Sequence, residues 1–232
     1  MVEIPCKRRG FLFKDGKVTV ASTKARAIIF IDGNNFYHGM KKEGLSSIEL
    51  DYAQFSRKLV INREWLETRY YIGRVKQEGD TTRYQKQQKF LHQLKTFDKV
   101  NYFLGRVERR EMKGASKKLN KWLNALPNRP DVSISPKIVE ELRRVASIDS
   151  VTWVEKAVDV MIATDMVSMA HENKYDIAYL LSADGDFTHA IKKVRDAGCK
   201  ILVASPVPGY QISKAADSFI RLDRKFFHGC WL

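Results

Sequence analysis

AIIFIDGNN, residues 27–35, is the stretch of this 232-residue chain that decides its fold class. Its first five residues are all apolar, and three of them are isoleucine. A short, uninterrupted apolar run is typical of a strand that is buried on both faces, as the strands of a parallel sheet are. Asp32 and Gly33 end the run, and Asn34 can cap a helix that continues to about Lys42. The stretch therefore predicts the first core strand and the helix after it.

Strand and helix patterns alternate along the rest of the chain. The sequence predicts helices at about 52–60, 82–97, 154–171, 187–197 and 212–216, and strands at about 66–75, 100–107, 177–181, 200–204 and 219–222. This alternation predicts an α/β fold, a parallel sheet covered by helices on both faces. Ligands of such sheets bind beyond the carboxyl ends of the strands.

Two segments fall outside the alternation. Residues 11–20 contain two short strand-like runs around an Asp-Gly turn, which predicts a small β-hairpin within an N-terminal extension of residues 1–24. Residues 108–150 carry many Lys and Arg residues together with three prolines. We interpret this segment as a partly helical, basic insertion on the surface of a main domain that spans residues 25–232.

The charge balance indicates a polyanionic partner. Lys and Arg number 41 against 27 Asp and Glu, which gives a formal net charge of +14. A surplus of this size attracts nucleic acids through the release of counterions, although solvated lysine faces are also common on basic proteins. Within the insertion, Lys117, Lys118 and Lys121 are the candidate contacts to the nucleic-acid backbone.

Composition also excludes several classes of protein. No apolar run approaches the roughly 20 residues that span a bilayer, and no signal-peptide core follows the N-terminal basic residues, so we expect a cytoplasmic protein without a membrane partner. The three cysteines form no CxxC pair, and the five histidines have no HExxH spacing. A disulfide framework and a zinc site are therefore disfavoured.

Aspartates gather where the predicted sheet would bind its ligands. Asp32 ends the first core strand, and Asp184 and Asp186 follow strand 177–181. Asp159 is placed near the start of the helix that leads into that strand. Because a helix that precedes a parallel strand runs antiparallel to it, its amino end lies beside the carboxyl ends of the strands. The four carboxylates are therefore expected to meet.

Asp165 is a further candidate, six positions after Asp159. Six residues advance a helix by about 9 Å and turn it to another face. Only one of the two aspartates is then expected to bind a metal directly, unless the helix begins late.

Carboxylates that gather without basic partners repel one another, and a divalent cation relieves that repulsion. Magnesium or manganese suits an all-oxygen site and promotes phosphodiester hydrolysis by activating water. Each residue also has a simpler explanation. An Asp after a strand is often a turn or cap residue, Asn34 and Asn35 are as often caps as ligands, and Lys156 is more often a solvated helix-end lysine than a phosphate contact.

Four motifs in order resemble the NYN domain of the PIN-like nuclease superfamily, in its LabA-like form. They are FIDGNN at 30–35, KAVDV at 156–160 with Asp165 after it, LSADGDF at 181–187, and ADSF at 216–219. The resemblance covers residues 27–222 apart from much of the insertion. It implies a Rossmann-like PIN fold and divalent-metal-dependent cleavage of nucleic acid, with RNA favoured over DNA.

The family's acids carry over residue by residue. The implied catalytic and metal-binding residues are Asp32, Asp159, Asp184 and Asp186, with Asp165 as a further metal ligand. The candidate substrate contacts are Asn34, Asn35, Lys156, Ser182, Lys117, Lys118 and Lys121. Asn34 stands where the family often has an acid, which weakens the charge of the first motif. Asp217 matches an acid near the last strand, and we expect it to make a structural hydrogen bond.

Other classes of protein fit less well. A haloacid-dehalogenase-like phosphatase needs a second Asp at position 34, and P-loop and dinucleotide-binding enzymes need glycine-rich motifs that the chain lacks. The remaining alternative is a non-catalytic nucleic-acid-binding or regulatory module with a vestigial acidic pocket. The sequence leaves oligomerisation open.

Overall fold

The computed structural model describes residues 11–14, 17–20, 24–77, 81–111, 113–129, 131–147 and 151–232. The chain divides into two compact units. The main unit comprises residues 1–106 and 157–232, and the inserted unit comprises residues 107–156. The sequence predicts the insertion at about 108–150.

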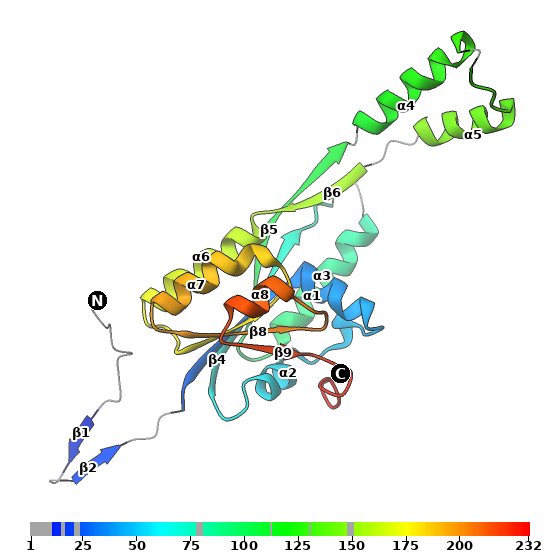
Figure 1. The fold of residues 1–232 in the computed structure, drawn as a ribbon. Helices are drawn as coiled ribbons and strands as arrows, with labels where there is room; N and C mark the ends of the chain where they lie inside the picture. Colours follow the sequence, from blue (N-terminus) through cyan, green and yellow to red (C-terminus); the bar gives the residue numbers. More distant parts are fainter. Residues whose placement is uncertain are drawn as a thin grey trace. The chain divides into compact units, whose positions relative to one another are not determined.

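The sheet has the strand order β6-β5-β4-β3-β7-β8-β9 (Figure 1). The bounds are β3 (Arg26–Asp32), β4 (Glu64–Arg74), β5 (Val100–Glu111), β6 (Val151–Lys156), β7 (Ile177–Leu181), β8 (Lys200–Ser205) and β9 (Ser218–Arg221). The pairings that join β5, β4, β3, β7, β8 and β9 in this order are all parallel. The predicted first strand, β3, therefore lies inside the sheet, between β4 and β7.

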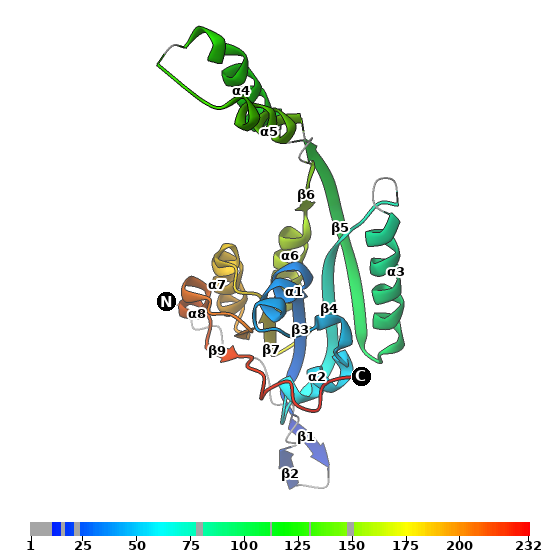
Figure 2. The same ribbon diagram turned by 90° about the vertical axis from the view of Figure 1, so that its right-hand side faces the viewer.

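Helices cover both faces of the sheet in the main unit. The first layer holds α1 (Gly33–Lys42), α2 (Tyr52–Leu59) and α3 (Thr81–Thr96), and the second holds α6 (Val158–His171), α7 (Thr188–Asp196) and α8 (Tyr210–Ala215). Figure 2 shows α3 and α7 on opposite sides of the central strands. Along β3, Ile29 and Ile31 pack into the core of the first layer, and Ile28 and Phe30 into the core of the second. The predicted doubly covered α/β fold is confirmed.

One boundary differs from the prediction in a way that matters for the site. The helix expected at 154–171 begins only at Val158, because residues 151–156 form strand β6. The run Val151-Thr152-Trp153-Val154 is β-branched and aromatic, which favours a strand. Ala157 has a φ of 72°, in the left-handed region, and separates the strand from the helix. Asp159 consequently lies in the first turn of α6.

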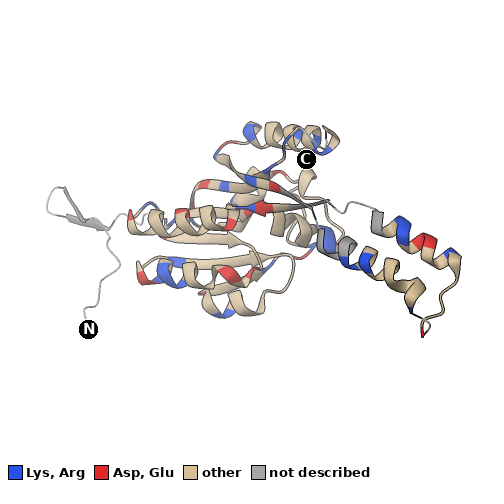
Figure 3. Cartoon of the chain, turned by 90° about the horizontal axis from the view of Figure 1, so that it is seen from above, with Lys and Arg blue, Asp and Glu red and all other residues tan. Residues whose placement is uncertain are grey.

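The inserted unit contains a pair of helices, α4 (Lys113–Ala125) and α5 (Pro136–Ser147), with a 3-10 turn at Leu126–Asn128. Leu123 is fully buried between them, and Arg143 Nη1 donates to Asn124 Oδ1 at 3.1 Å. Figure 3 shows Lys and Arg on both helices. Lys118 and Lys121 are exposed, while the side chain of Lys117 lies outside the described part of the chain.

The N-terminal segment contains two short strands, β1 (Phe11–Lys14) and β2 (Lys17–Val20), that pair antiparallel with Phe11 opposite Val20. The expected Asp-Gly turn between them lies outside the described residues. In the part of the chain that is described, none of the helices combines the length and apolarity that crossing a bilayer requires.

Candidate nuclease active site

Asp32 joins the end of β3 to the start of α1. Its Oδ1 accepts a hydrogen bond from the backbone N–H of Asn35 at 3.0 Å, so Asp32 is the N-cap of the helix. Asn34, which the sequence offered as a cap or as a ligand, is not the cap, because α1 begins at Gly33, two residues earlier than a cap at Asn34 implies. Asp32 Oδ2 accepts from Ser182 Oγ at 3.2 Å. Both oxygens of a side chain that is only 4% exposed are therefore held in place.

Gly33 allows the first turn of α1 to pack closely against β4. A Cβ added to Gly33 would lie 2.5 Å from Tyr70 Cε1 and 2.6 Å from the carbonyl oxygen of Tyr71. No other residue has room here unless the backbone of β4 moves. The first turn of α1 thus rests directly on β4 and sets the direction of the Asp32 carboxylate.

The loop after β7 is tied to the same helix. Asn35 Oδ1 accepts from the backbone N–H of Ala183 at 3.0 Å, and Ser182 Oγ accepts from the N–H of Asp184 at 3.1 Å. Asp184 Oδ1 in turn accepts from the N–H of Asp186 at 2.9 Å and caps the 3-10 turn Gly185–Phe187. The loop is a closely bonded turn that carries two carboxylates.

The carboxylates influence one another electrostatically. Burial raises the pKa of Asp32 to about 6, and the charges of Asp159 and Asp184 add to the shift. Burial also raises the pKa of Asp159, with further contributions from Asp184 and Asp186. These electrostatic interactions connect the four aspartates expected from the sequence, which we call the acid cluster: Asp32, Asp159, Asp184 and Asp186.

The donor chemistry of the acid cluster fits a hard divalent cation, because every side-chain ligand atom is a carboxylate oxygen. None of the ion pairs found among the described residues involves these four aspartates. In the side-chain conformations of the described residues, however, no three acidic, His or Cys groups are gathered closely enough to hold an ion. Binding would therefore require side chains of the cluster to turn toward a common point.

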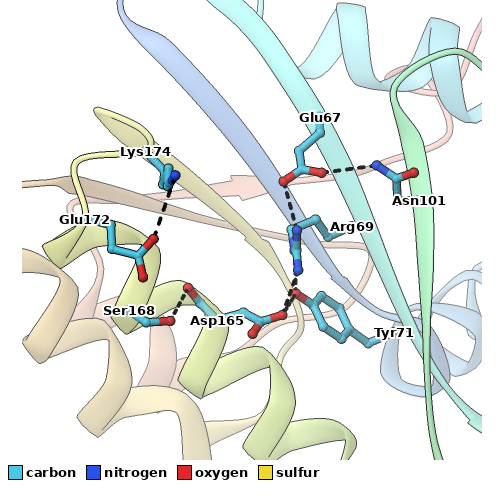
Figure 4. A network of polar contacts seen from close by, with 8 residues as sticks. All are labelled: Glu67, Arg69, Tyr71, Asn101, Asp165, Ser168, Glu172 and Lys174. Carbon is cyan, nitrogen blue, oxygen red and sulfur yellow. Dashed lines mark hydrogen bonds and ion pairs between the residues drawn. The ribbon is translucent and has the colours of Figure 1, made fainter.

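Asp165 belongs to a different network (Figure 4). Its Oδ2 accepts from Arg69 Nη2 at 2.9 Å and from the Tyr71 hydroxyl at 2.7 Å. Arg69 Nη1 also donates to Glu67 Oε1 at 2.9 Å, and the guanidinium lies 4.0 Å from the centroid of the Phe103 ring. Asp165 thus ties α6 to β4, while Asp159 one and a half turns earlier joins the acid cluster.

Sequence reasoning missed Arg69 as an anchor. A signal for it was present, because an arginine inside a strand of a doubly covered sheet needs a paired acid. The identity of that acid could not be read from the chain, since Asp165 is 96 positions away.

The remaining candidates fall in several places. Asn34 is exposed next to Asp32, and Lys156 is the last residue of β6 in the inserted unit. Asp217 makes the structural contacts that we expected: its Oδ2 accepts from the N–H of Ile201 at 2.8 Å, and its Oδ1 pairs with Arg195 at 3.2 Å.

A parallel sheet covered by helices on both faces, with acids beyond the carboxyl ends of its strands, is consistent with a domain of the PIN-like class. The model of the NYN domain family matches residues 26–223, and the chain belongs to that family. NYN domains are in general PIN-like nucleases, which supports a nuclease role and a nucleic-acid substrate.

Comparison with solved structures gives a likeness in fold. A crystal structure of a protein of unknown function from Vibrio parahaemolyticus superposes with a TM-score of 0.56 at 18% sequence identity, over 89% of this chain and 98% of that one. A search among curated proteins finds no match.

Proposed function

We propose that the protein is a divalent-metal-dependent endonuclease that hydrolyses phosphodiester bonds, with RNA as the favoured substrate. The observation that carries the proposal is the Asp32 carboxylate at the carboxyl edge of the sheet, held by hydrogen bonds to both oxygens, with its pKa raised to about 6 by burial and, to a smaller extent, by the charges of Asp159 and Asp184. A buried carboxylate whose pKa is raised and that has other acids nearby is typical of catalytic sites.

The four aspartates of the acid cluster are the residues that would hold Mg²⁺ or Mn²⁺. When bound, such an ion activates water and neutralises charge on the leaving oxygen of a phosphodiester. Asp32 is the rigid member, because both of its oxygens already accept hydrogen bonds. Asp186 is exposed and stands at the solvent side of the cluster.

Asn35 and Ser182 have positioning roles in this proposal, since their hydrogen bonds hold the acid-bearing loop against α1. Asn34 is the polar side chain that is exposed toward a substrate at the same helix end. Carboxylates repel a polyanion, so a bound cation supplies local attraction and basic residues supply it over longer range. Lys156, Lys117, Lys118 and Lys121 are the proposed backbone contacts.

A second candidate function is a nucleic-acid-binding or regulatory module without catalysis. It is favoured by one observation: among the described residues, no three His, Cys, Asp or Glu side chains lie close enough together to hold a metal ion. Incubation of the protein with labelled single-stranded RNA in Mg²⁺, Mn²⁺ or EDTA separates the two functions, because only the nuclease cuts and only when metal is present.

A further inference from the structure

An exposed tyrosine opens the last helix of the second layer. Tyr210 is the first residue of α8 and is 74% exposed. Among the described residues, no large apolar side chain is more exposed. A single exposed aromatic needs no special explanation, so its surroundings decide whether it has a role.

The neighbours of Tyr210 on both sides contact the acid-bearing loop. A Cβ added to Gly209 would lie 3.2 Å from Ala183 Cα, and one added to Gly185 would lie 2.5 Å from Gln211 Oε1. Tyr210 stands between these two contact points in the chain. The start of α8, where Tyr210 is placed, therefore lies beside the loop that holds Asp184 and Asp186.

Lys214 lies one helical turn after Tyr210 and covers one side of it. Its Nζ is 4.0 Å from the ring centroid and donates to the tyrosine hydroxyl at 2.7 Å. The ammonium group therefore fixes the orientation of the ring by a cation–π contact and a hydrogen bond together. Since Tyr210 is three-quarters exposed, most of its surface stays open to a ligand even with Lys214 in place.

We propose that Tyr210 and Lys214 form a platform on which one unpaired base of a single-stranded nucleic acid stacks, with Lys214 beside the adjacent phosphate. The inference rests on the proposed function for its class of substrate. Stacking on an aromatic ring tolerates any base, because every base has a π-face, and it requires that the base has left the duplex. The platform thus selects single strands at the position next to the acid cluster.

The test measures binding of short single-stranded RNAs in which one abasic position is moved along the chain. The protein carries Asp184→Asn, so that turnover does not interfere. We expect one abasic position to weaken binding about tenfold, and Tyr210→Ala to weaken binding of the intact RNA by a similar factor. In the Tyr210→Ala protein, the same abasic position should not weaken RNA binding any further. Tyr210→Phe keeps the aromatic ring and should bind the intact RNA as the parent does.

A matched lysine tests the role of the charge. Lys95 also lies over a tyrosine, with its Nζ 5.5 Å from the centroid of Tyr102, but on the opposite layer. Lys214→Ala should lower the dependence of affinity on log salt by about 0.7, the value for one phosphate contact on a single strand. Lys95→Ala should leave the salt dependence unchanged.

Several outcomes would overturn the platform. The first is that every abasic position lowers RNA affinity by the same factor, whether or not Tyr210 is present. The second is that duplex and single-stranded RNA bind with equal affinity. The third is that the Asp184→Asn parent protein does not bind single-stranded RNA. Metal-dependent cleavage by the wild-type protein in any of these cases leaves the nuclease proposal standing. Conversely, a Tyr210-dependent abasic effect without any cleavage upholds the platform and rejects the nuclease.

Discussion

The carboxylate of Asp32 and the hydroxyl of Ser182 are hydrogen-bonded at 3.2 Å across 150 positions of sequence. The contact exists because β3 and β7 are parallel neighbours, with Ile31 opposite Leu181. Both strands therefore end at the same edge of the sheet. The acid cluster is thus a product of strand pairing in the main unit.

The first prediction separates Asp159 from Asp165. Mg²⁺ at about 100 times its dissociation constant stabilises a protein that binds it only when folded by about 2.7 kcal/mol. We expect Mg²⁺ to raise the melting temperature of the wild-type protein and of Asp165→Asn by several degrees, and of Asp159→Asn very little. Calorimetry with and without Mg²⁺ measures this, and an Asp165→Asn variant that loses the shift would make Asp165 a ligand.

The second prediction concerns the anchor of α6. Arg69→Met leaves the partly buried Asp165 and Glu67 without their cation, and we expect a loss of about 1 to 3 kcal/mol in the free energy of unfolding, discounted for the partial exposure of Asp165. Arg26→Met is the matched control, because the Arg26–Asp176 pair has the same 2.9 Å distance but side chains 39% and 40% exposed. It should cost less than about 1 kcal/mol. Equal losses in urea titrations would refute the anchoring role.

The third prediction is a pH dependence of stability. The pKa of Asp32 is about 6 in the folded protein, compared with 3.8 for an ordinary aspartate, so folding favours the protonated form. Its contribution to stability is present below about pH 4 and is lost as the pH rises through about 6. In EDTA, Asp32→Asn should therefore be more stable than the wild-type protein by about 3 kcal/mol near pH 8, and no more stable near pH 4. A difference that does not vary with pH would show that the carboxylate is not perturbed.

The fourth prediction tests the inserted unit. Replacing Lys117, Lys118 and Lys121 together by Gln should weaken RNA binding and reduce its slope against log salt by about 2, since each phosphate contact on a single strand contributes about 0.7. The control is the same change at Lys86, Lys89 and Lys95, three exposed lysines of α3. An unchanged slope in the first triple variant would place the nucleic-acid track elsewhere.

The sequence predicted the sheet well where burial is complete. All five residues of β7 are buried, and its predicted bounds, 177–181, agree with the structure. The position of Asp32 and Asp184 just after neighbouring parallel strands also agrees with the order of elements predicted from the sequence. Local patterns were sufficient for these features.

Features that depend on partners far away in the chain were not predicted. The role of Asp165 depends on Arg69 and Tyr71, two residues of β4 that no local pattern connects to it. The second hydrogen bond of Asp32 comes from Ser182, which is 150 positions away in the chain. The early placement of the start of α6 has a local cause instead, because the run at 151–154, which favours a strand, was assigned to the helix.

Cleavage of labelled single-stranded RNA by the wild-type protein and by Asp184→Asn, in Mg²⁺, Mn²⁺ and EDTA with matching DNA alongside, tests the central claim most directly. The proposed nuclease predicts cutting that requires metal and falls at least about a hundredfold in Asp184→Asn, because a lost metal ligand removes several kcal/mol of transition-state stabilisation. RNA affinity should stay nearly unchanged in the variant, since basic residues supply most of the non-specific binding. Equal cutting by Asp184→Asn, or binding without cutting in every metal, would contradict the claim.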